Sequence, residues 1–162
     1  MFLCFVSIHS YVAHKAGGAL VGGRGLNVAN HVILVQLLIE EYKGVPLALA
    51  SSSHTMVIDA ILDKLGFRRY FDVVVSGFEL ENGKPAPDIF LYAADLLGTP
   101  NAETLVIEDT ANGVLAAKNA GMKCFGYQNT TNPTRQDLSM ADFISDDFSS
   151  VTLDQLRKVM EG

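Results

Sequence analysis

Four glycines divide the chain in the same way, because each follows an apolar pattern of helical period and precedes a strand-like run within a few residues. They are Gly44, Gly66, Gly98 and Gly121. Glycine is favoured just past a helix end because it adopts the left-handed conformation without a Cβ clash. The helices that they end are predicted over residues 30–43, 54–65, 87–97 and 110–120. The chain therefore alternates helices with short connecting strands.

The runs between these helices have the composition of strands that are buried on both faces. They cover residues 45–50, 72–76, 104–107 and 123–127. The absence of strict apolar–polar alternation is typical of a parallel sheet covered by helices on both sides. Residues 141–145 add a short edge strand, and residues 153–160 a closing helix. The pattern predicts an α/β fold with a doubly wound, Rossmann-like parallel sheet, in which ligands bind beyond the carboxyl ends of the strands.

Polar residues stand at three places where such a fold binds ligands. One apolar run leads into the adjacent carboxylates Glu108 and Asp109, and carboxylate oxygens are the hard ligands that Mg²⁺ prefers. Another leads into Ser51 and two further serines at a helix start, where free N–H groups and the helix dipole favour anions. Between them, Lys84 lies in a stiff glycine–lysine–proline turn. Together these residues predict a site for a phosphate group and a metal ion.

Each of these residues also has a purely structural interpretation. Asp109 or Thr110 is suited to capping the helix that follows, and Ser52 or Ser53 to capping the helix that begins at residue 54. Lys84, taken alone, reads as a solvated lysine in a surface turn. These alternatives remain open at the level of sequence.

The order and spacing of these motifs resemble those of the haloacid dehalogenase-like (HAD) superfamily of phosphatases and phosphomutases. Within it, the chain is most similar to the beta-phosphoglucomutase-like branch. Ser51 matches the second motif of the family, Lys84 the third, and Glu108 with Asp109 the fourth. The resemblance covers residues 44–162.

The resemblance implies a role for each of these residues in handling a small phosphorylated metabolite with Mg²⁺ as cofactor. Ser51 and the backbone N–H of Ser52 would bind phosphate oxygens, and Lys84 would pair with the phosphoryl group. Asp109 would ligate Mg²⁺ directly, with Glu108 as a second or water-mediated ligand. Lys84 and Asp109 would thus be the catalytic residues.

The first motif of that family is missing. It is an Asp-x-Asp just after the first strand, which supplies the nucleophile and the general acid. The chain contains no Asp-x-Asp, and its first aspartate is Asp59, beyond Ser51. The helical cap that normally precedes the second motif has no room either. We therefore expect a HAD-like core that is truncated at its N-terminal side and inactive or impaired, or alternatively a non-catalytic domain that binds phosphate and Mg²⁺. A receiver domain does not fit, because the lysine precedes the acids.

The first part of the chain departs from this pattern, so we divide the chain into an atypical segment, residues 1–29, and a HAD-like core, residues 30–162. Residues 2–8 are the only candidate for the central strand of the sheet. If they occupy that position, Ser7 and His9 fall near the places of the missing aspartates. The glycine-rich stretch 17–25 reads as a linker, because Val28 stands where a dinucleotide-binding motif needs its third glycine.

Composition limits the possible partners and cellular location of the protein. The chain has 162 residues, of which 49% are hydrophobic and 19% charged, with a net charge of −6, which argues against nucleic acid or an anionic membrane as a partner. The apolar first residues lack the positive flank of a signal peptide. Cys124 lies in an apolar strand and is predicted to be a buried free thiol. A reducing, cytoplasmic location fits best.

Overall fold

The structure is a computed structural model and describes residues 3–6, 45–128, 130 and 134–161. The helix predicted over residues 30–43 lies outside the described residues, as do Gly44, Ser7, His9 and the glycine-rich stretch. The proposed boundary at residue 29 lies outside them as well.

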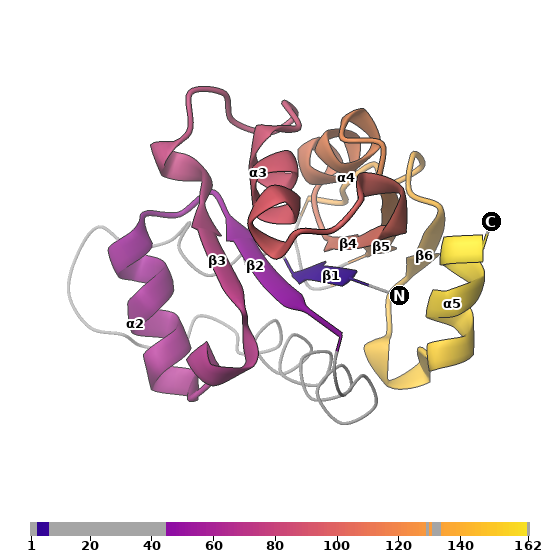
Figure 1. Cartoon of the computed structure of the whole chain (residues 1–162). Helices are drawn as coiled ribbons and strands as arrows, with labels where there is room; N and C mark the ends of the chain where they lie inside the picture. The colour runs from indigo at the N-terminus through magenta and orange to yellow at the C-terminus, as the bar shows by residue number, and fades with distance from the viewer. Residues whose placement is uncertain (1–2, 7–44, 129, 131–133, 162) are drawn as a thin grey trace.

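Six parallel strands form one sheet in the order β3-β2-β1-β4-β5-β6 (Figure 1). Their bounds are β1 Leu3–Val6, β2 Leu47–Ser51, β3 Val73–Ser76, β4 Thr104–Glu108, β5 Lys123–Tyr127 and β6 Phe143–Ser145. The order runs outward from β1 in both directions, and this is the doubly wound arrangement. The predicted fold class is confirmed.

Helices cover both faces of this sheet. They are α2 Thr55–Leu65, α3 Asp88–Leu97, α4 Ala111–Asn119 and α5 Leu153–Glu161. The helices α3 and α4 lie on one face, and α2 and α5 on the other (Figure 1). Successive strand residues divide between the two cores, since Leu47 and Leu49 pack with α2 while Ala48 and Ala50 pack with α3. This explains why the strands show no apolar–polar alternation.

Three of the four glycines that end the predicted helices lie in the described part of the chain. Gly66, Gly98 and Gly121 have φ angles of 68°, 66° and 72°. This is the left-handed conformation that glycine adopts without a Cβ clash. The predicted helix ends at residues 65 and 97 are therefore confirmed, with their physical cause, and α4 ends one residue before the predicted residue 120.

The strand predicted near the N-terminus occupies the centre of the sheet. β1 lies between β2 and β4, and its Val6 is aligned with Leu49 on one side and with Ile107 on the other. Ser51 comes two residues after Leu49, and Asp109 comes two residues after Ile107. These two residues therefore lie on either side of the carboxyl end of β1. Two strand spacings separate them, a backbone distance of about 10 Å.

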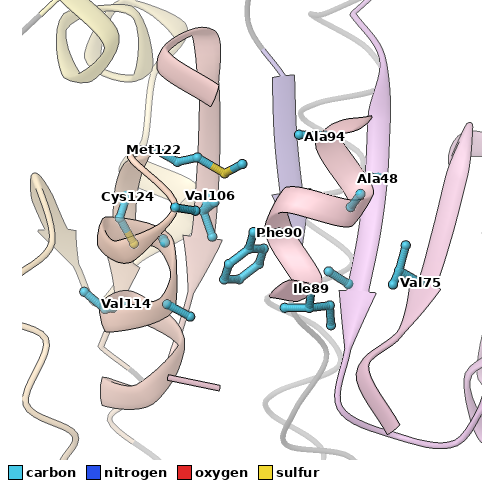
Figure 2. Close-up of a cluster of buried hydrophobic side chains, with 14 of the residues drawn as sticks. Ala48, Val75, Ile89, Phe90, Ala94, Val106, Val114, Met122 and Cys124 are labelled. Atoms are coloured by element: carbon cyan, nitrogen blue, oxygen red, sulfur yellow. The ribbon is translucent and has the colours of Figure 1, made fainter. Parts of the chain in front are cut away.

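Figure 2 shows the core between the sheet and the α3–α4 layer. Phe90 of α3 is fully buried there and belongs to the same cluster as Val106 of β4 and Val114 of α4. Cys124 of β5 is a free, fully buried cysteine in this cluster, as predicted. Burial, and then the negative charge of Glu108, raise the pKa of its thiol far above the usual range.

Candidate phosphate and metal site

Polar side chains gather at the carboxyl edge of the sheet, where β2, β3 and β4 end. Ser51, Ser76 and Glu108 are the last residues of these strands, and all three are buried. Asp109 follows directly after β4 and is only 4% exposed. Because buried polar groups are costly unless other groups satisfy them, their concentration at one edge marks the candidate site.

Lys84 and Glu108 form a buried ion pair at this edge. The ammonium Nζ of Lys84 donates to Oε1 of Glu108. The two side chains are 4% and 0% exposed, so the interpretation of Lys84 as a solvated turn lysine is wrong. The pair joins the segment before α3 to the end of β4.

The second oxygen of Glu108 is held by the start of the next helix. Oε2 accepts hydrogen bonds from the backbone N–H of Asp109 and of Thr110, both at 3.0 Å, and from the Thr110 hydroxyl at 2.9 Å. Both N–H groups precede Ala111, the first residue of α4, so the hydrogen-bond ladder of the helix does not use them. The carboxylate is therefore fixed in place from both sides.

Thr110 is the cap of α4. Its hydroxyl oxygen accepts from the N–H of Gly113 at 3.1 Å. Of the two residues that the sequence offered as caps, Thr110 takes this role, and Asp109 lies buried beside it. Asp109 is thus a buried acid that directly follows Glu108 of the Lys84–Glu108 pair in the chain.

Contacts with α3 and α4 fix the loop that carries Lys84. The Asn119 side chain donates to the carbonyl oxygen of Pro85 at 3.0 Å. The Lys84 ammonium lies 4.7 Å from the centre of the Phe90 ring, a cation–π distance. The backbone of the loop is therefore anchored, while the position of the ammonium depends on a flexible side chain.

The serine segment after β2 is held from β3. The Ser51 hydroxyl oxygen accepts from the N–H of Ser53 at 3.2 Å, and the Ser76 hydroxyl donates to the Ser53 carbonyl at 2.8 Å. Ser51 is 1% exposed. The cap position of α2 is His54, and it makes no side-chain cap hydrogen bond. The alternative interpretation, in which Ser52 or Ser53 caps this helix, is wrong, because the segment folds back on Ser51 before the helix begins.

The two adjacent carboxylates at this edge are a donor set that suits Mg²⁺. The described ranges contain no group of three or more His, Cys, Asp or Glu side chains able to hold a metal. Mg²⁺ is usually bound by only one or two carboxylates, with water and substrate phosphate as its other ligands. The adjacent acids Glu108 and Asp109 fit that requirement.

Several residues at this edge carry no motif and were missed in the sequence. Phe90 and Asn119 support Lys84 and its loop, and Gln136 accepts from the N–H of Ala111 at 3.2 Å. The last contact ties the segment after β5 to the start of α4. Of the residues that support the site, only Thr110 could be recognised in the sequence, because it directly follows the acidic pair at a predicted helix start.

Gly113 of α4 lies directly against the Glu108 carboxyl group. A Cβ at this position would fall 2.0–2.3 Å from the carboxyl atoms of Glu108. Because a side chain at this position would collide with the Glu108 carboxyl group, only glycine fits here without a shift.

We expect Gly113→Ala to lower the free energy of unfolding by about 1–3 kcal/mol or more, because the added methyl group forces the carboxylate to move. In an ordinary helix, replacing glycine by alanine would instead raise the free energy of unfolding by about 1 kcal/mol. The sign of the change therefore shows whether the contact with Glu108 exists. Urea unfolding measures it. Gly83→Ala is the control, since a Cβ there meets nothing within 4 Å. Equal stability of the two variants would contradict the contact.

A buried lysine, two acids and a serine segment lie at the carboxyl edge of a doubly wound α/β sheet, which is the edge where proteins of this fold class bind their ligands. Residues 34–121 match the haloacid dehalogenase-like hydrolase family. The chain belongs to this family.

Known proteins similar to the chain agree with this assignment. Fructose-1-phosphate phosphatase YqaB from Escherichia coli (strain K12) is 40% identical over 77 residues, which are 48% of this chain and 41% of that protein. CbbY from Rhodobacter sphaeroides in complex with phosphate has a TM-score of 0.69 and 27% identity, covering 79% of this chain and 57% of that one. Beta-phosphoglucomutase from Clostridium difficile has a TM-score of 0.67 and 26% identity, covering 79% and 55%.

These comparisons confirm the resemblance to HAD-like hydrolases with beta-phosphoglucomutase-like structural neighbours. The chain spans 41% of the E. coli phosphatase and between 55% and 57% of the two neighbours, so it matches about half of their length or less. None of the helices within the described ranges has the length and apolar character of a membrane-crossing segment.

Proposed function

We propose that this chain binds a small phosphate ester and Mg²⁺ at the carboxyl edge of its sheet, and that it turns the ester over poorly. The observation that carries the proposal is the buried Lys84–Glu108 pair beside Asp109. The register places Ser51 across the line of β1 from Asp109. The side chains that would bind phosphate and metal thus share one edge.

Each residue has a chemical role in this proposal. The Ser51 hydroxyl and the Ser52 N–H would donate to phosphate oxygens, and the Lys84 ammonium would neutralise phosphoryl charge. Asp109 would bind Mg²⁺ directly, with Glu108 as a second or water-mediated ligand. The ion would supply charge neutralisation at the phosphate oxygens. Lys84 and Asp109 are the residues that we assign to catalysis.

The poor turnover follows from the missing nucleophile. In the family that the chain resembles, an aspartate attacks phosphorus and a covalent aspartyl-phosphate forms. The first aspartate of this chain, Asp59, instead lies in α2 and forms a partly exposed ion pair with Arg68. It is therefore unavailable to replace the nucleophile.

The substrate class is a small phosphorylated metabolite. A fructose-1-phosphate phosphatase and a phosphate-bound structure among the relatives support this class. Local cations must bind the anion, because the net charge of −6 gives no general attraction. The free thiol of Cys124 supports a reducing compartment such as the cytoplasm.

A second candidate function is a non-catalytic or regulatory domain that binds phosphate and Mg²⁺. The observation that favours it is an ordered arrangement of Lys84, Glu108 and Thr110 in a chain without Asp-x-Asp. Turnover distinguishes the two functions, whereas binding is common to both.

The binding test is calorimetric titration of Mg²⁺ with inorganic phosphate present, with Asp109→Asn as the variant. We expect Asp109→Asn to weaken Mg²⁺ binding by at least about tenfold, because it removes a charged ligand. Asp59→Asn removes the same charge from the surface pair with Arg68 and should leave the affinity unchanged. Equal affinity in the wild type and Asp109→Asn would reject the proposed site.

A further inference from the structure

We propose that Gln136, which lies outside every motif of the sequence, is a positioning residue for the metal ligand Asp109. It acts through the first N–H group of α4, and the segment that carries it, residues 136–142, is a brace for that helix. The inference rests on the proposed function, because it takes Asp109 to bind a divalent cation. It adds a residue on which the affinity for that cation depends.

The brace contacts α4 near both of its ends. Oε1 of Gln136 accepts a hydrogen bond at 3.2 Å from the N–H of Ala111, the first residue of the helix. The Lys118 ammonium, one residue before the helix ends, donates to Oδ2 of Asp142 at 2.7 Å. Ala111 and Lys118 are about two helical turns apart, or roughly 10 Å along the axis. The brace therefore runs beside α4 in the same direction.

The brace is itself fixed to the sheet. The Asp142 N–H donates to the Cys124 carbonyl oxygen of β5 at 2.8 Å, and Oδ2 of Asp142 accepts from the Cys124 N–H at 2.7 Å. Leu138 is 2% exposed and belongs to the core cluster between the sheet and the α3–α4 layer. A Cβ on Gly126 of β5 would fall 3.3 Å from the Cβ of Leu138. The segment that carries Gln136 is therefore packed into the core.

The contact with Ala111 lies two residues after Asp109 in the chain. The N–H groups of Asp109 and Thr110 hold Oε2 of Glu108, and Ala111 is the next residue. Because peptide groups are planar and rigid, a shift of Ala111 moves the backbone that carries both acids. Losing a group that orients a metal ligand typically costs about 10- to 100-fold in affinity. Gln136 acts one step further from the ligand, so we expect a smaller effect.

Gln136 also has a purely structural interpretation. In that interpretation it only provides an acceptor for an N–H group in the first turn of α4, as the Thr110 hydroxyl does for Gly113. A structural role predicts that its loss lowers the stability of the protein and leaves cation affinity unchanged. Cation affinity therefore distinguishes the two roles.

The test is calorimetric titration of Mg²⁺ with inorganic phosphate present, in the wild type, Gln136→Met and Gln136→Glu. Methionine has a similar length without a strong acceptor, so we expect at least about threefold weaker binding, below the range for groups bonded to a ligand itself. Glutamate keeps an acceptor oxygen within reach of the Ala111 N–H and should restore wild-type affinity. All titrations use about 1 M potassium chloride, where a screening length of about 3 Å removes the general effect of the added charge.

The matched control is Lys118→Met, which removes the contact between the brace and the other end of α4. Asp142 keeps its bonds to Cys124 in this variant, so the brace stays in place and Mg²⁺ affinity should match the wild type. Wild-type affinity in Gln136→Met would overturn the inference while the site stands. An equal loss in Gln136→Met and Lys118→Met, or no recovery in Gln136→Glu, would also overturn it. A wild type that binds no Mg²⁺ would refute the proposed function as well.

Hydrogen exchange in the wild type covers the case in which Gln136→Met fails to fold. Coupling is reciprocal, so a hydrogen bond that raises cation affinity is stabilised to the same extent by the bound cation. We expect saturating Mg²⁺ with inorganic phosphate to slow exchange of the Ala111 N–H at least about threefold. The Ser139 N–H, which donates to Asp137 within the brace, should keep its rate. An unchanged Ala111 rate in the protein with Mg²⁺ bound would contradict the role of Gln136.

Discussion

The double substitution Ser7→Asp with His9→Asp is expected to raise phosphatase turnover on the order of a hundredfold or more above the unmodified chain. The resemblance to the HAD superfamily places a nucleophilic aspartate and a proton-donating aspartate just after the first strand. β1 ends at Val6 between β2 and β4, and Ser7 and His9 follow it in the sequence. The two new carboxylates would supply the groups that the chain lacks.

A steady-state assay with an aryl phosphate and several sugar phosphates in Mg²⁺ measures this effect. The unmodified chain should show negligible turnover, and adding Asp109→Asn to the double variant should abolish the gain. No gain in the double variant would mean that the chain does not continue from β1 towards Ser51 and Asp109. Robust turnover by the unmodified chain, lost in its Asp109→Asn variant, would mean that another residue is the nucleophile.

The substitution Glu108→Gln is expected to lower the free energy of unfolding by about 3–5 kcal/mol, the usual cost of removing one charge from a buried ion pair. It leaves the Lys84 ammonium in a site where its side chain is only 4% exposed. Glutamine preserves the shape of the side chain, so the loss reports charge rather than a cavity. Chemical unfolding followed by circular dichroism measures it.

The matched control is Asp59→Asn, which removes one charge from an ion pair with Arg68 at the surface. The side chains of that pair are 42% and 52% exposed, and such pairs contribute about 1 kcal/mol or less. A loss for Glu108→Gln as small as that for Asp59→Asn would contradict the buried pair on which the site is built.

The fold was predictable because its signals are local. Gly66, Gly98 and Gly121 end helices through their own backbone conformation, and β2 and β4 are short and apolar because both of their faces are buried. Helix starts were predicted one residue early, as at Thr55 and Ala111. At these two helices the first predicted residue, His54 or Thr110, is a cap with non-helical backbone angles.

The contacts within the site were less predictable, because they are tertiary. Lys84 and Glu108 are 24 residues apart, and nothing in either local sequence specifies that they pair. The serine segment was misjudged because a hydroxyl before a helix suits both a cap and a local turn, and packing against Ser76 selects the turn around Ser51. The missing Asp-x-Asp, by contrast, is visible only in the sequence.

The central claim is that Ser51, Lys84 and Asp109 form one site for phosphate and a divalent cation. A crystal structure of the chain grown with Mn²⁺ and inorganic phosphate tests it most directly, because anomalous scattering locates the ion without assumptions. We expect the ion to lie against the Asp109 carboxylate, with phosphate between Ser51 and Lys84. An ion and a phosphate bound away from this edge, or no binding at crystallisation concentrations, would contradict the account.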